Sequence, residues 1–300
     1  MTTNDYLMTI NDFLMTLTTD LVRLNNLPLA ARLVSDELRL GMQVSRRAGA
    51  GTEFEQFRHY VAGDDPKRMD WKRYAQTDQY LIRESATESN AQIRLLLDGS
   101  GSMNYAEGSV SRLQYAKLLL ASLAYVANRQ SDALSLYGLQ NGVVRPLVAA
   151  GAGAFQKIVA ALESARASGS WPTDRVDLPQ FGRKQTEMLL IASDLLQVGD
   201  EWLTLVRSLA GPRREIVLFQ ILGDDELDFD LRGYYRFEDL ETGRTVALQT
   251  ETARAAVRER ASAYLSRLDD ALRLPHVRLV RARLSEPVGA VLTRFLVQTR

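Results

Sequence analysis

The sequence predicts an α/β protein built on a doubly wound, mostly parallel sheet. Three observations predict this fold. A continuous apolar run at residues 93–97 is typical of a strand buried on both faces. Further strand-like and helical segments then alternate along the chain. Finally, short polar loops follow two of the strand-like runs, which is where such folds place their ligands.

The first 90 residues precede this alternating pattern. Apolar spacing over residues 7–21 and 33–42 predicts two helices, separated around Pro28. Residues 53–61 and 79–84 are rich in aromatic and β-branched side chains and are expected to be extended. We therefore divide the chain into an N-terminal helical segment (1–45), a small extended or β module (46–90) and the main α/β domain (91–300).

The main domain contains five strand-like segments and five helical ones. Its strands are expected at residues 93–97, 133–139, 188–192, 215–222 and 276–281. Its helices are expected at residues 111–128, 154–167, 202–209, 252–272 and 287–297. Asn141-Gly142 is a hairpin turn signal, so one strand is expected to pair antiparallel with its predecessor.

Composition excludes several classes of function. Lys and Arg together number 37, as do Asp and Glu, so no net charge draws the whole chain to nucleic acid. The absence of Cys excludes disulfides, thiolate metal sites and cysteine nucleophiles. With only His59 and His276 as imidazoles, any bound metal is expected to be a hard cation held by oxygen.

The N-terminal residues do not resemble a targeting segment. Asp5 and Asp12 precede the first basic residue, Arg23, which is the reverse of a signal peptide's charge order. No stretch approaches the roughly 18 uncharged apolar residues of a membrane span. We therefore expect a cytoplasmic protein without direct membrane insertion.

Polar side chains gather where two predicted strands end. Asp98, Ser100 and Ser102 lie at alternate positions of one glycine-containing loop, and Asp194 follows a later strand. A carboxylate and two hydroxyls in this spacing can direct oxygens at one cation, most plausibly octahedral Mg²⁺ or Mn²⁺. Thr173 is the candidate ligand from a second loop, with Ser170 as the alternative.

These residues resemble a von Willebrand factor A domain. The resemblance rests on residues 98–103 (Asp-Gly-Ser-Gly-Ser-Met), residues 111–113 at the start of a helix, residues 132–134 entering a strand, and Asp194. It implies a metal-ion-dependent adhesion site, in which Ser100 and Ser102 bind the metal directly. Asp98 and Asp194 would act largely through water and hydrogen bonds, and a partner's Asp or Glu would fill a free position.

The preceding module narrows the resemblance to the bacterial proteins grouped as domain of unknown function family fifty-eight. Its motifs are Gly51-Thr52-Glu53-Phe54, Arg58-x-Tyr60, Gly63-Asp64-Asp65-x-x-Arg68-x-Asp70-Trp71 and Leu81-x-Arg83-Glu84. Such proteins are commonly encoded beside MoxR-type AAA+ ATPases. The resemblance therefore implies a non-enzymatic adaptor or co-chaperone whose partner is a MoxR-type AAA+ ATPase.

Other interpretations remain open. The loop at residues 98–102 could be a turn that caps the following helix. The acidic residues of the 63–71 motif could form a salt-bridged structural turn rather than a second site. A metal-dependent phosphoesterase could use the same strand ends, although the sequence offers no convincing nucleophile or general base. A structural scaffold with a vestigial site is the third possibility.

Overall fold

A computed structural model describes most of the main domain and parts of the first 90 residues. The described residues are 22, 26–48, 56–59, 69, 74, 79–84, 91–140, 143–169, 187–196, 201–211 and 213–297. The chain divides into two compact units. One comprises Met1–Arg39 with Ala91–Arg300, and the other comprises Leu40–Asn90.

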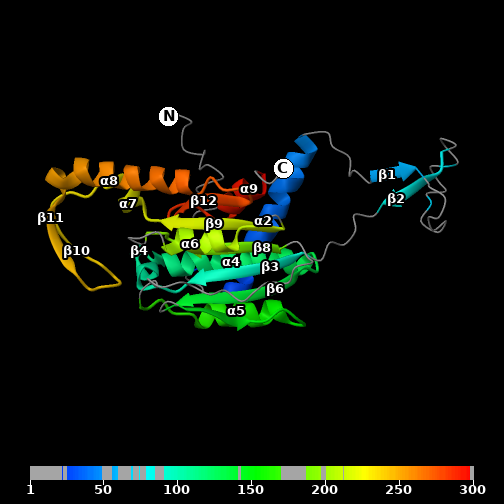
Figure 1. Ribbon diagram of the computed structural model, residues 1–300, viewed down its shortest axis with the longest axis horizontal. Helices are drawn as coiled ribbons and strands as arrows, with labels where there is room; N and C mark the ends of the chain where they lie inside the picture. Colours follow the sequence, from blue (N-terminus) through cyan, green and yellow to red (C-terminus); the bar gives the residue numbers. More distant parts are fainter. Residues whose placement is uncertain are drawn as a thin grey trace, which may run out of the picture. The chain divides into compact units, whose positions relative to one another are not determined.

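A six-stranded sheet forms the centre of the larger unit (Figure 1). Its strands, in spatial order, are β12 (Val277–Arg283), β9 (Arg214–Leu222), β8 (Glu187–Ser193), β3 (Gln92–Asp98), β6 (Ala133–Gln140) and β7 (Val143–Val148). All neighbouring pairs are parallel except β6 and β7, which form an antiparallel hairpin at one edge. The hairpin predicted from Asn141-Gly142 is therefore confirmed by the pairing of its two strands.

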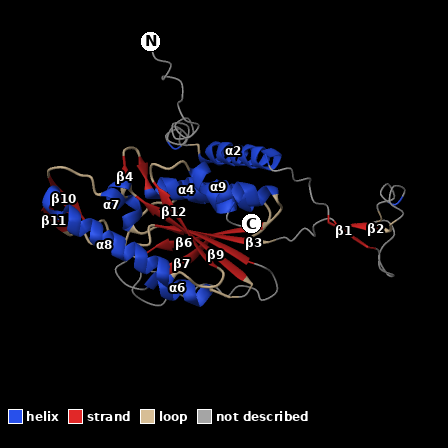
Figure 2. Cartoon of the chain, turned by 90° about the horizontal axis from the view of Figure 1, so that it is seen from above, coloured by secondary structure: helices blue, strands red, loops and turns tan. Residues whose placement is uncertain are grey.

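Helices cover both faces of this sheet (Figure 2). One layer contains α4 (Arg112–Arg129), α5 (Ala154–Ser164) and α9 (Val288–Val297). The other contains α6 (Glu201–Leu209) and α8 (Thr250–Ala271). This two-sided covering explains why the middle strands contain runs of buried apolar residues, because neither face of the sheet meets water there.

The predicted fold class is confirmed. A mostly parallel sheet with helices on both faces and one antiparallel edge strand is a von Willebrand factor A-like arrangement. All five predicted strands and all five predicted helices of the main domain are present, with ends displaced by a few residues. The two parallel neighbours of β3 are β6 and β8, so the loops after β3 and β8 lie side by side at the carboxyl edge.

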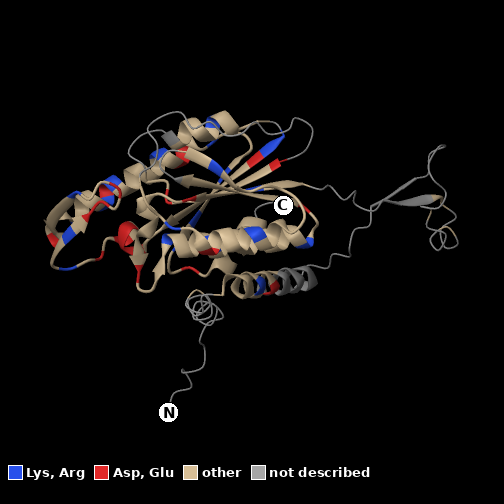
Figure 3. Cartoon of the chain, turned by 90° about the horizontal axis from the view of Figure 1, so that it is seen from below, with Lys and Arg blue, Asp and Glu red and all other residues tan. Residues whose placement is uncertain are grey.

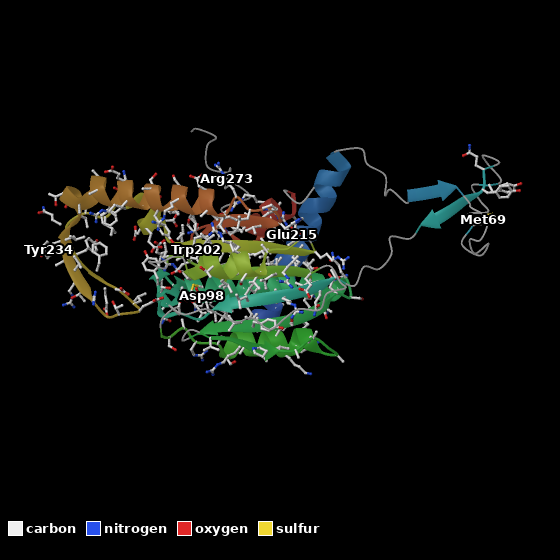
Figure 4. The ribbon with its side chains drawn as sticks, viewed as in Figure 1. Met69, Asp98, Trp202, Glu215, Tyr234 and Arg273 are labelled. Atoms are coloured by element: carbon white, nitrogen blue, oxygen red, sulfur yellow. The ribbon has the colours of Figure 1, made fainter. Side chains whose placement is uncertain are left out.

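Several short elements near this edge were not predicted. They are the 3-10 turn η2 (Gly101–Asn104), strands β4 (Ala106–Glu107) and β5 (Val110–Ser111), helix α7 (Asp224–Asp228), and strands β10 (Tyr234–Glu238) and β11 (Thr245–Gln249). Strands β10 and β11 form an antiparallel ribbon of largely exposed residues that leads into α8. Tyr234 projects from this ribbon into solvent (Figure 4).

Helix α2 (Leu27–Ala48) includes the second predicted N-terminal helix. It begins one residue before Pro28, which is favourable in a first helical turn because that position needs no N–H donor. Ala31 and Val34 are buried, and Ser35 donates a hydrogen bond to the backbone oxygen of Ser122 on α4. The helix expected at residues 7–21 lies outside the described residues.

The smaller unit contains β1 (Gln56–His59) and β2 (Leu81–Glu84), which pair antiparallel. Both strands lie inside the segments predicted to be extended. Except for Met69, the motif from Gly63 to Trp71 lies outside the described residues. Its two interpretations, structural turn and second carboxylate site, both stay predictions.

Candidate metal centre

The loop after β3 brings two hydroxyls together. Asp98 ends β3, and its Oδ1 accepts a hydrogen bond of 2.8 Å from the backbone N–H of Ser100. The chain then enters η2, whose turn places Ser100 Oγ 3.0 Å from Ser102 Oγ. The alternate spacing of these serines thus produces a convergent pair of oxygen donors.

Asp98 is a buried carboxylate at the carboxyl end of β3 (Figure 4). Its Oδ2 accepts a hydrogen bond of 2.6 Å from the hydroxyl of Ser193, at the end of β8. The pKa of Asp98 is raised from 3.8 to about 7, mainly by burial and also by the neighbouring charge of Asp194, while the hydrogen bonds from Ser193 and Ser100 act in the opposite direction. A nearby cation would oppose this destabilisation of the carboxylate.

Asp194 lies directly after β8 and is fully buried. Its Oδ1 accepts a hydrogen bond from the backbone N–H of Leu196, and its Oδ2 accepts one of 2.8 Å from Arg112. The side-chain amide of Gln220, on β9, donates to the backbone oxygen of the same residue. The position of Asp194 is therefore determined by contacts from β9 and from α4.

Arg112 is a contributor to this centre that the sequence analysis did not assign. It opens α4, after Ser111, whose side chain forms a capping box with Gln114. The buried guanidinium of Arg112 donates to Asp194 and to the backbone oxygen of Ser102, and it forms an ion pair with Glu226. A cation in the first turn of a helix is unfavourable, because it faces the positive end of the helix dipole. The position of Arg112 in the sequence therefore indicates that this side chain has specific acidic partners.

The donor set fits a small hard cation. Adjacent ligands in octahedral Mg²⁺ coordination lie about 2.9 Å apart, since each Mg–O bond is about 2.0–2.1 Å. The observed 3.0 Å between Ser100 Oγ and Ser102 Oγ matches this separation. Among the residues that the structure describes, no group of three or more His, Cys, Asp or Glu side chains could hold a metal. Hydroxyls must therefore provide part of any metal shell here.

The structure thus brings together four of the five predicted ligands. Asp98 and Asp194 lie at the adjacent ends of β3 and β8. Ser193 donates a hydrogen bond to Asp98, and Arg112 donates one to Asp194. Ser100 and Ser102 lie beside them. Thr173 and its alternative, Ser170, lie outside the described residues, so the ligand from the second loop stays a prediction.

The turn between β10 and β11 lies against the loop that holds Ser100 and Ser102, which we call the serine loop. A Cβ atom built on Gly101 would be 2.6 Å from the backbone oxygen of Leu240 and 3.0 Å from that of Gly169. Only a residue without a side chain permits this approach. The backbone N–H of Gly101 also donates to the Gly169 oxygen. Gly101 therefore joins the serine loop to two other segments.

Comparison with known families identifies the chain. A family model described as "Protein of unknown function DUF58" matches residues 56–267. The chain belongs to this family. Uncharacterized proteins of Mycobacterium bovis and Mycobacterium tuberculosis are 24% identical to it over 251 residues, which are 79% of this chain and 78% of theirs. The expected membership of family fifty-eight is confirmed.

Two solved structures are similar to part of this chain at low sequence identity. The conserved hypothetical protein BatB from Bacteroides thetaiotaomicron is 14% identical, with a TM-score of 0.44, over 69% of this DUF58 chain and 98% of BatB. The SpRpn10 VWA domain is 12% identical, with a TM-score of 0.39, over 67% of this chain and 93% of that domain. In the described part of the DUF58 chain, no helix is both long and apolar enough to cross a membrane.

Proposed function

We propose that this DUF58 protein is a non-enzymatic protein-interaction module whose partner binding depends on a divalent cation, Mg²⁺ or Mn²⁺. The observation that carries the proposal is the pair of serine hydroxyls, 3.0 Å apart, at the carboxyl edge of the sheet. Ligands of α/β folds bind at this edge. When bound, the cation would supply a positive centre with a position for a carboxylate oxygen of the partner.

The hydrogen bonds of the two carboxylates support different roles for Asp and Ser. Each oxygen of Asp98 and each oxygen of Asp194 already accepts a hydrogen bond from protein. The hydroxyls of Ser100 and Ser102 contact each other and can turn their lone pairs toward a cation. We therefore assign direct binding to the two serines, with the two aspartates supplying charge and orientation.

The charge balance of the centre favours a cation. When Asp98, Asp194 and Glu226 are ionised, the single guanidinium of Arg112 leaves two formal negative charges. A divalent cation would neutralise them, and its open coordination position would accept a carboxylate oxygen of a partner.

The proposed partner is a MoxR-type AAA+ ATPase, for which this protein would act as adaptor or co-chaperone. The resemblance to family members encoded beside such ATPases motivates this choice. The sequence contains no Gly-x-x-x-x-Gly-Lys-Ser/Thr phosphate-binding motif, so ATP hydrolysis would belong to the partner.

Capture of a purified MoxR-type ATPase from the same genome tests the function. The full-length DUF58 protein is immobilised, and capture is compared in Mg²⁺ and in EDTA. We expect binding in Mg²⁺ that EDTA and the double substitution Ser100→Ala/Ser102→Ala abolish. Equal capture in EDTA would overturn the metal dependence, and no capture in either buffer would overturn the choice of partner.

The same preparations distinguish the phosphoesterase alternative. Hydrolysis of a generic phosphomonoester is measured in Mg²⁺ and Mn²⁺ with wild type and Asp98→Ala. The interaction module predicts no metal-dependent turnover. Turnover that disappears in Asp98→Ala would identify an enzyme instead.

A further inference from the structure

We infer that the partner segment supplying the carboxylate carries a second acidic side chain next to an apolar one, and that these enter a groove beside the serine loop. This inference rests on the proposed function, because it assigns the chemistry of the partner. It adds a second binding surface, which is built from the edge hairpin β6–β7 and the end of α5.

The groove is continuous with the candidate metal centre. It has a volume of ≈ 260 Å³, and Gly99, which lies between Asp98 and Ser100, forms part of its lining. The backbone N–H of Gly99 donates to the Leu139 oxygen of β6, and the Gly99 oxygen accepts from the Ser168 N–H after α5. A chain bound at the serine loop therefore reaches the groove within a few residues.

The groove walls are apolar and incompletely covered. Leu97 and Leu139 are buried beneath it, whereas Val143 and Leu147 on the edge strand are 46% and 47% exposed. Leu147 packs over Gly138, where a Cβ atom would lie 3.0 Å from its Cδ1. An apolar side chain of a partner would remove part of this surface from water.

Two guanidinium groups line the same groove. Arg145 lies on β7 and is exposed, and no ion pair joins it to an acidic residue in the described part of the chain. Arg166 follows α5, and its Nη1 donates to the backbone oxygens of Glu163, Ser164 and Ala165, which fixes it at the helix end. No acidic side chain is among the described residues that line the groove. The exposed guanidinium of Arg145 favours a carboxylate in the partner.

The shape of the groove favours a side chain over other occupants. Its volume is below the roughly 300–1,000 Å³ of typical small-molecule sites. Strand β7 is the edge of the sheet, but Pro146, between Arg145 and Leu147, has no N–H for pairing with an added strand. The geometry thus favours a peptide that crosses the carboxyl edge and inserts side chains.

Selection from a displayed library of random peptides tests this inference. Full-length wild type, Arg145→Glu/Arg166→Glu and the control Arg267→Glu/Arg273→Glu are each used as target in Mg²⁺. The control carries the same charge change at exposed positions of α8 and the residues after it. Thermal melting of each variant verifies that it folds.

We expect wild type and control to select peptides with two acidic residues and a neighbouring Leu, Met or Phe. The groove variant should select peptides in which one acidic residue is replaced by Lys or Arg. A synthetic peptide of the wild-type consensus should bind the groove variant about tenfold more weakly or worse. Identical selections by wild type and groove variant, or no acidic–apolar pattern with wild type, would overturn the inference.

Selection on Ser100→Ala/Ser102→Ala, and on wild type in EDTA, separates this inference from the proposed function. If both inference and function hold, each of these conditions loses the selected peptides. If peptides are retained there yet change with Arg145→Glu/Arg166→Glu, the metal-dependent function fails and the acidic–apolar groove stands.

Discussion

Arg112 brings a permanent positive charge into the candidate metal centre from the first turn of α4. Its side chain is 2% exposed, and that of its partner Asp194 is fully buried. The guanidinium also stacks over the ring of Tyr105, 4.5 Å from its centroid. At the scale of single residues, Arg112 joins α4 to the end of β8 through Asp194 and to the loop after β3 through the Ser102 backbone oxygen.

We predict that Arg112→Gln lowers the free energy of unfolding by about 3–5 kcal/mol, because it leaves Asp194 buried without its cation. Urea unfolding of the EDTA-treated protein measures the loss. Arg112→Gln/Asp194→Asn should recover most of it, since neither residue then carries a charge. A loss below about 1 kcal/mol in the single variant would show that the pair is not desolvated as the structure indicates.

The raised pKa of Asp98 predicts a pH-dependent stability in the metal-free protein. Between pH 3.8 and about 7 the folded state retains a proton that the unfolded chain has lost. The free energy of unfolding should therefore fall as the pH rises through this window, by on the order of a few kcal/mol. Asp98→Asn should remove this fall, as measured by melting in EDTA at a series of pH values. A wild-type profile parallel to that of Asp98→Asn would contradict the prediction.

The sequence pattern predicts the acidic and hydroxyl residues of the centre but not the positively charged side chain beside them. Asp98, Ser100, Ser102 and Asp194 were found because they follow apolar strands, and a parallel sheet brings such ends together. Arg112 and Glu226 belong to a helix start and to a long acidic segment. Their pairing depends on how α4 and α7 pack, and no spacing along the chain reveals that contact.

At the scale of elements, prediction succeeded where strands are buried on both faces. The main strands carry runs of buried apolar residues because helices cover them. The ribbon of β10 and β11 was missed because most of its side chains are exposed on both faces and show no alternation. Helix α7 falls within the acidic segment 224–241 and consists mostly of acidic residues (Figure 3). Its Asp224 and Asp228 form ion pairs with Arg283.

The contact between the serine loop and the β10–β11 turn can be tested at Gly101. We predict that Gly101→Ala destabilises the protein by about 1–3 kcal/mol, since the new Cβ would overlap the Leu240 backbone oxygen. The matched control is Gly211→Ala, where a Cβ would meet nothing within 4 Å. Chemical denaturation measures both. Equal stability of the two variants would contradict the placement of the turn.

The opposite end of the sheet is held by a buried ion-pair network. Glu187, at the start of β8, accepts hydrogen bonds from Arg94 at 3.2 Å and from Arg214 at 3.1 Å. Arg94 also donates to the hydroxyl of Tyr137 on β6. The network therefore joins four adjacent strands at their amino ends, away from the candidate metal centre.

We predict that Glu187→Gln costs about 3 kcal/mol or more of unfolding free energy, because the buried guanidinium of Arg94 and the partly buried one of Arg214 lose their shared carboxylate. Glu215→Gln is the matched control, since Glu215 pairs with Arg278 in a partly exposed position, and it should cost about 1 kcal/mol or less. Urea unfolding of both variants gives the comparison. A cost for Glu187→Gln as small as for Glu215→Gln would contradict the role of the network.

At the scale of the whole molecule, the larger unit places its proposed binding groups at one end of the strands and a second ion-pair network at the other. The amino ends of the strands carry the Glu187 network, and the carboxyl ends carry the serine hydroxyls, the aspartates and the groove at Gly99. The smaller unit, Leu40–Asn90, forms its own compact body. Substitution of the serine hydroxyls at the carboxyl edge should therefore change ligand binding with a smaller effect on folding than substitution of Glu187 at the amino edge.

The most direct measurement is thermal melting of the full-length protein in Mg²⁺ and in EDTA. A bound cation adds about 2.7 kcal/mol at a concentration one hundred times its Kd, which corresponds to a rise of about 5 °C or more. We predict this rise for wild type and for Ser208→Ala, whose hydroxyl bonds only the Leu205 backbone within α6. Ser100→Ala/Ser102→Ala should fold but show no rise. Equal melting of wild type in the two buffers, or an undiminished rise in the double variant, would contradict a metal centre at the serine loop.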